Sequence, residues 1–90
     1  MRYALIARDK PDHLQTRLDN RPAHLDYMKA SGAVDMAGPF LDDAGNMCGS
    51  LIVLNFDTLD QAWDWANNEP YFKAGLFAEI DIKPWNKVIG

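Results

Sequence analysis

His24 is the residue of this chain that is best suited to acid–base chemistry. It lies in the stretch RLDNRPAHLDYM, Arg17 to Met28, just inside the predicted start of a helix. A helix N-terminus disfavours a protonated imidazole, and the neutral imidazole is the form that a general base needs. Asp9 stands at the exit of the predicted first strand, where its carboxylate could orient the ring. The sequence therefore predicts a His24–Asp9 dyad; the alternative is a surface or capping histidine.

Four more residues are candidates for binding a substrate beside this dyad. Ser50 begins a predicted strand, where its hydroxyl could donate to a substrate oxygen or instead bond the backbone. Arg17 or Arg21 could hold an acidic substrate, because a guanidinium matches a carboxylate with two hydrogen bonds, although either also fits an exposed helix position. Tyr71 fits packing better than proton donation, since an ordinary tyrosine has a pKa of about 10.

The charge and the reactive side chains exclude several classes of function. The formal net charge is −4 and no basic cluster is present, so we expect no nucleic acid partner. His13 is a poorer candidate than His24, and the spacing between the two histidines matches no metal-ligand motif. Cys48 is the only cysteine and leaves neither an internal disulfide nor a CxxC motif. We therefore expect no metal and no cofactor.

The apolar segments are too short to cross a membrane. LIVL, residues 51–54, is a run of only a few apolar residues, far below the length of a transmembrane helix. The opening stretch MRYALIA leads directly into charged residues and does not resemble a signal peptide. We expect one domain over residues 1–90, located in the cytoplasm.

The site must be positioned by four predicted strands and two helical regions. The predicted strands are Arg2–Arg8, Ala33–Phe40, Ser50–Phe56 and Leu76–Trp85. Their order with the helical regions is β-α-β-β-α-β. This order is typical of the α+β, ferredoxin-like fold, a four-stranded antiparallel sheet with both helices on one face.

The first helical region is predicted in two pieces. One piece runs from Asp12 to about Leu18, and the second runs from Pro22 to about Ser31. The residues DNRP separate them, because a proline disfavours a helical conformation in the residue before it. The second helical region is DTLDQAWDWANN, residues 57–68, and EPYFKAG, residues 69–75, is predicted as a turn.

Two of the strands are apolar on both faces, which predicts a second copy of the chain. LIVL and YALIA show this pattern, yet two helices cover only one face of the sheet. The other face would be bare in a monomer, and large bare apolar patches mark interfaces. We therefore expect a homodimer packed sheet to sheet.

Several motifs together resemble the YciI-like (YCII-related) family. They are ARDKPDHLQTRLDNRPAHLDYM, AGP, GSLIVLNF, EPYFKAGL and IKPWNKV, in the family's order and over nearly the whole chain. The most specific piece is R-x-x-x-R-P-x-H-L, from Arg17 to Leu25, with Asp9 upstream. The resemblance implies a ferredoxin-like fold, dimerisation as an α+β barrel, and a site centred on a histidine and an aspartate. His24 and Asp9 match those two residues.

The sequence departs from the family at one position of interest. Family members usually carry an aspartate before the proline of DPY, whereas this chain has Glu69 in EPY. The extra methylene would move the carboxylate, so a substrate-binding role at Glu69 is an open expectation.

These observations support three hypotheses. The first is a cofactor-free enzyme that performs isomerisation or elimination on a small polar or hydroxylated cyclic substrate, with His24 as general base or acid. The second is a homodimer that binds a small metabolite without catalysis. The third is a structural homodimer without a ligand. The chemistry of the first hypothesis depends partly on analogy with isomerases and small monooxygenases of the dimeric α+β barrel group, and fold alone does not fix function.

Overall fold

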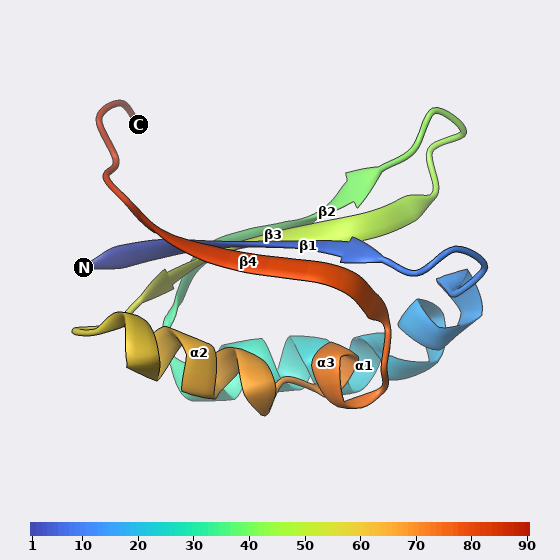
Figure 1. Cartoon of the computed structure of the whole chain (residues 1–90), viewed down its shortest axis with the longest axis horizontal. Coiled ribbons are helices and arrows are strands. Elements are labelled where there is room, and N and C mark those ends of the chain that lie inside the picture. Colours follow the sequence, from blue (N-terminus) through green and yellow to red (C-terminus); the bar gives the residue numbers. More distant parts are fainter.

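One antiparallel sheet organises the protein, with all its helices on one side (Figure 1). The computed structural model describes all 90 residues. The strands are β1 (Arg2–Asp9), β2 (Val34–Leu41), β3 (Met47–Asn55) and β4 (Phe77–Trp85), and their order across the sheet is β2-β3-β1-β4. The helices are α1 (Leu14–Ser31), α2 (Leu59–Asn67) and α3 (Pro70–Lys73). The predicted β-α-β-β-α-β order is confirmed, with α3 added before the last strand.

The core lies between the sheet and α2. Strand residues alternate between the two faces of a sheet, and Leu5 of β1 and Leu54 of β3 are among those that point toward the helices and are fully buried. The apolar stripe of α2 packs against them through Trp65 and its neighbours. Thr58 caps this helix, with its hydroxyl accepting from the N–H of Gln61, so the predicted second helix is confirmed.

The predicted break in the first helical region is wrong. α1 is continuous over 18 residues, with Pro22 inside it. A proline within a helix removes one hydrogen bond and costs about 3 kcal/mol or more. The helix continues because it is anchored on both sides of Pro22, through the buried side chains of Arg17 and His24. His24 therefore lies in the middle of a helix, and the expected effect of a helix N-terminus on its imidazole does not apply.

The segment predicted as a turn after α2 contains α3. Glu69 caps this short helix, its carboxylate accepting from the N–H groups of Tyr71 and Phe72. Pro70 occupies the first turn, where its missing N–H needs no partner. Gly75 follows in the left-handed conformation and turns the chain into β4.

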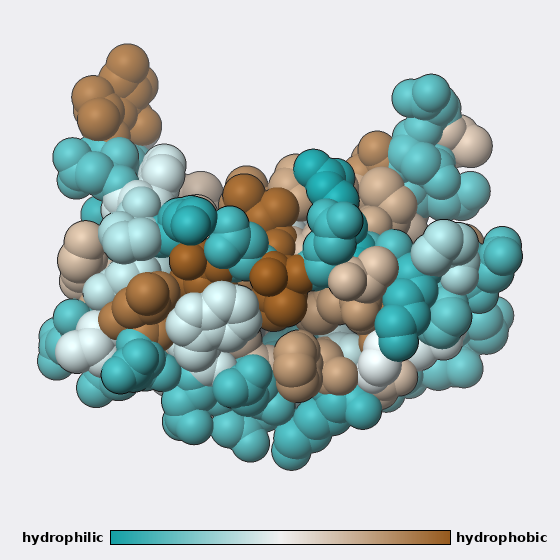
Figure 2. Space-filling model, viewed as in Figure 1, coloured by the Kyte–Doolittle hydropathy of each residue, from teal (hydrophilic) through white to brown (hydrophobic).

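The face of the sheet opposite the helices is uncovered and largely apolar at its centre. The register places Ile6 of β1 beside Leu51 of β3, and Ala4 beside Val53. Figure 2 shows this side of the molecule hollowed between the C-terminal end and the β2–β3 turn, with apolar side chains in the hollow. None of the helices is long and apolar enough to cross a membrane.

Gly49 lets β3 lie close to the backbone of β1, next to Ser50. A Cβ at Gly49 would lie 2.5 Å from the carbonyl oxygen of Ala7 and 3.1 Å from the ring of Phe40. We predict that Gly49→Ala lowers the free energy of unfolding by about 1–3 kcal/mol, as overpacking does, measured by urea denaturation. The matched control is Gly38→Ala on β2, whose added Cβ meets nothing within 4 Å. Equal stability of the two variants would contradict this prediction.

Candidate active site

A pocket of about 110 Å³ lies between α1 and strands β2 and β3. A cavity of roughly 150 Å³ encloses one benzene molecule, so a small ring would fill this pocket and extend through its opening to solvent. α1 contributes five of its lining residues: Arg17, Arg21, His24, Leu25 and Met28. The other lining residues come from β2, β3 and α3. They are Ala37, Gly38 and Pro39 of β2, Met47, Ser50 and Ile52 of β3, and Tyr71 of α3.

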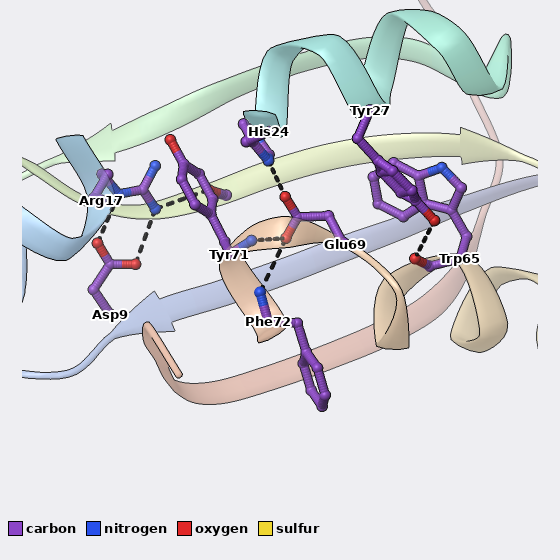
Figure 3. Close-up of polar contacts among 9 residues, drawn as sticks. Asp9, Arg17, His24, Tyr27, Trp65, Glu69, Tyr71 and Phe72 are labelled. Atoms are coloured by element: carbon purple, nitrogen blue, oxygen red, sulfur yellow. Dashed lines mark hydrogen bonds and ion pairs between the residues drawn. The ribbon is translucent and has the colours of Figure 1, made fainter. Parts of the chain in front are cut away.

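His24 is held at this pocket by the carboxylate of Glu69 (Figure 3). Its Nδ1 contacts Oε1 of Glu69, while Oε2 accepts the N–H groups of Tyr71 at 3.0 Å and Phe72 at 3.2 Å. Both His24 and Glu69 are buried. An ionised carboxylate only accepts hydrogen bonds, so the proton of this contact lies on Nδ1. A neutral His24 therefore keeps its lone pair on Nε2.

The Nε2 atom of His24 is available to a ligand. It makes no hydrogen bond within the chain. The indole nitrogen of Trp65 is the one buried side-chain nitrogen or oxygen without a partner. Nε2 of His24 also lacks a partner, and His24 lines the pocket with 7% of its side chain exposed. His24 thus has the arrangement of a general base: one nitrogen oriented by a buried carboxylate and the other accessible.

The predicted contact between Asp9 and His24 is not formed. Asp9 instead accepts two hydrogen bonds from Arg17, from Nε at 2.7 Å and from Nη2 at 2.9 Å. Arg17 and His24 are seven residues apart on α1, which is about 10 Å along a helix. Asp9 faces the first half of that helix and Glu69 the second. The carboxylate that orients His24 is therefore that of Glu69, the residue whose role was an open expectation from the sequence.

Arg17 is a structural member of the pocket wall. Only 3% of its side chain and 6% of that of Asp9 are exposed, and Nη2 also donates to Oγ of Ser50 at 2.9 Å. Burial works against the charge of Arg17, but the hydrogen bond and the attraction to Asp9 outweigh it and raise its pKa above the ordinary value. Ser50 only accepts in this contact, so its O–H remains able to donate to a substrate oxygen. Arg17 has Nε and Nη2 occupied by Asp9 and Ser50, which leaves less of its guanidinium for a substrate than the sequence suggested.

Tyr71 lies between Arg17 and His24 (Figure 3). Its ring stacks on the imidazole with centroids 3.9 Å apart and planes 14° apart, and the guanidinium carbon of Arg17 lies 4.6 Å from the centre of the ring. Burial raises the pKa of Tyr71, more than the nearby charges of Arg17 and Arg21 lower it. The phenol therefore stays protonated near neutral pH, and its main contribution is to hold the imidazole plane.

The structure brings together most of the residues singled out in the sequence. His24, Arg17, Arg21, Ser50 and Tyr71 line one pocket, and Glu69 lies behind it. His13 lies apart and contacts the carbonyl oxygen of Pro11. No three His, Cys, Asp or Glu side chains are grouped so that they could hold a metal ion.

The sequence analysis missed the apolar part of the pocket. Leu25 and Met28 belong to the same face of α1 as His24, since residues three and four apart are neighbours on a helix. All three residues lie within the second predicted helical piece, so the sequence showed their spacing, but it did not show that β2 and β3 complete a pocket around them.

Breaking the buried pair of Asp9 and Arg17 should cost far more stability than breaking an exposed pair. We predict that Asp9→Asn lowers the free energy of unfolding by about 3–5 kcal/mol, because it leaves the charge of Arg17 buried without a counter-charge. The control is Asp35→Asn, which breaks the exposed pair between Arg2 and Asp35 and should cost about 0.2–1 kcal/mol. Equal losses in urea denaturation would show that the buried pair has no special weight.

The fold and much of the sequence are shared with known proteins. A solved structure of 5-chloro-2-hydroxyhydroquinone dehydrochlorinase (TftG) from Burkholderia phenoliruptrix AC1100, in complex with 2,5-dihydroxybenzoquinone, is 32% identical. It superposes with a TM-score of 0.87 and covers 96% of this chain and 94% of that one. The crystal structure of an antibiotic biosynthesis monooxygenase matches with a TM-score of 0.58 at 10% identity, over 98% of both chains. This second likeness supports the fold alone.

The sequence comparisons cover nearly the whole chain. Protein YciI of Escherichia coli O6:H1 is 36% identical over 97 residues, spanning 98% of this chain and 99% of that protein. An uncharacterized protein of Haemophilus influenzae matches with the same identity and coverage. The profile of the YCII-related domain matches residues 1–86. The chain therefore belongs to the YCII-related domain family.

Proposed function

We propose that this protein is a small enzyme that performs elimination or isomerisation on a hydroxylated six-membered ring, with His24 as the general base. The observation that carries the proposal is the imidazole of His24, oriented at Nδ1 by the buried Glu69 and accessible at Nε2. The relative TftG supports the substrate class, because it is described as a dehydrochlorinase of a chlorinated hydroxyhydroquinone and was solved with a dihydroxybenzoquinone.

The reaction needs only side chains of the pocket. His24 Nε2 takes a proton from a ring hydroxyl, and Glu69 stabilises the imidazolium that results. The electron pair left on the oxygen moves into the ring. His24 then gives its proton to a ring carbon, and an isomerisation ends there with the new ring tautomer. In an elimination this carbon carries the leaving group and becomes tetrahedral; His24 next takes a proton from a second ring hydroxyl, and the electrons of that oxygen expel the leaving group as an anion.

The surroundings of His24 suit this proton transfer. The stacked ring of Tyr71 fixes the imidazole plane, and an aromatic face attracts a cation. Leu25 and Met28 give the pocket apolar walls that fit the faces of a ring. The same pocket without turnover would correspond to the second hypothesis, a metabolite-binding protein, so activity assays separate the two.

His24 and Glu69 should act as one unit. We predict that His24→Gln lowers kcat by about 10²–10⁴ on 5-chloro-2-hydroxyhydroquinone, followed by chloride release, because general-base catalysis contributes about that factor. Glu69→Gln should lower kcat by a similar factor, since an amide no longer compensates the imidazolium charge. The double variant should be no slower than the slower single variant, because residues that act as a unit are not additive.

An exposed carboxylate serves as the control for these variants. Asp60→Asn on α2 removes the same charge away from both the pocket and the uncovered sheet face and should leave kcat unchanged. Full activity of Glu69→Gln, or additive effects in the double variant, would contradict the role of Glu69. Binding of the ring by the wild type without any turnover would favour the metabolite-binding hypothesis.

We also propose that two chains pack through the uncovered sheet face. Ile6 at its centre is 39% exposed in the single chain, and exposed apolar patches of this kind mark interfaces. Sedimentation equilibrium should therefore give twice the chain mass of 10.2 kDa. Ile6→Asp should shift this mass toward the monomer, whereas Leu18→Asp on α1, where the leucine is 44% exposed, should not. A wild type that stays monomeric at high concentration would refute the dimer.

A further inference from the structure

Arg21 is the one ionic residue lining the pocket whose charge has no partner. Arg17 pairs with Asp9, and His24 is held by Glu69. Arg21 forms no ion pair and donates no side-chain hydrogen bond within the chain. The pocket thus presents an uncompensated positive charge in a protein whose net charge is −4.

The sequence of α1 leaves this charge free. The neighbours of Arg21 on the helix surface are three and four residues away, and they are Arg17, Leu18, His24 and Leu25. None of them is acidic, so no ion pair along the helix competes for the guanidinium. An oxyanion bound in the pocket would be its first counter-charge.

The guanidinium of Arg21 is close to the groups that would contact a ring. Arg21 lies between Arg17 and His24 along the face of α1 that lines the pocket. Its positive charge acts on the phenol of Tyr71. Burial raises the pKa of this phenol, whereas the charges of Arg17 and Arg21 act to lower it. A ring that reaches His24 would therefore have one edge near Arg21.

We propose that Arg21 is the specificity-determining residue of the site and selects rings that arrive as oxyanions, the enolates or phenolates of acidic ring hydroxyls. This inference rests on the proposed function and names the substrate class more closely. The anionic oxygen lies at Arg21, and a second ring oxygen lies beside His24. Neutral rings of the same size lack the first contact and bind weakly.

The test compares two rings of one size in the wild type and in three variants. The probes are 2,5-dihydroxybenzoquinone, whose hydroxyls are vinylogous acids and ionise at neutral pH, and hydroquinone, which stays neutral. Arg21→Gln removes the charge, Arg21→Lys retains it, and Lys29→Gln removes a charge elsewhere on α1. Affinities are measured by isothermal titration calorimetry at low and at high salt.

We expect Arg21→Gln to weaken binding of the quinone about tenfold to a hundredfold, the range for a lost hydrogen bond to a charged group. Its affinity for hydroquinone should change less than about twofold, because a neutral ring has no charge for the guanidinium to bind. Arg21→Lys should retain most of the quinone affinity, and Lys29→Gln should match the wild type. Added salt should weaken the quinone complex of the wild type more than that of Arg21→Gln.

Any other outcome contradicts a definite part of the proposal. If Arg21→Gln binds the quinone as tightly as the wild type, or weakens both rings equally, the anion preference is wrong while the base role of His24 is untouched. If Lys29→Gln has the same effect as Arg21→Gln, the preference comes from the general field of the protein and not from this site. If the wild type binds neither ring, both the inference and the proposed function fail.

Discussion

The carboxylate of Glu69 is the interaction on which the arrangement of the site depends. One of its oxygens caps α3 and the other contacts His24 on α1. These two contacts fix a four-residue helix that is too short to be stable by itself. Because α3 carries Tyr71, the same carboxylate also sets the ring that stacks on the imidazole. Three features of the site therefore share one cause: the cap, the orientation of His24 and the stack.

The protein has an apolar half and a polar half beneath one sheet. Around α2 the interior is made of aliphatic and aromatic side chains such as Leu54 and Trp65. Under α1 the buried residues are Arg17 and His24, each of which needs a carboxylate to be buried at acceptable cost. A polar interior of this kind contributes little net stability, but it places charged groups in fixed positions beside a pocket.

Local patterns predicted the parts of the fold that local physics decides. The four strands and the end of α1 near Ser31 follow from residue types within a few positions, and all are found. Pro22 was misjudged because tertiary anchoring outweighed a local preference. The candidate residues of the site were correctly gathered, but their pairing was not. Which carboxylate meets His24 depends on where the end of β1 and the start of α3 lie along α1, and spacing in the sequence does not contain those positions.

The two sides of the pocket differ in how firmly the backbone holds them. The side with His24 is fixed by buried ionic contacts, whereas the opposite wall belongs to β2, an edge strand whose ladder bonds run to β3 only. Its pairing already shifts register twice, between Val34 and Met36 and between Phe40 and Leu41. Backbone that is bonded on one side can move outward without breaking a second ladder. If the pocket binds rings, as proposed, displacement of β2 accommodates wider ones while the contacts of His24 keep their geometry.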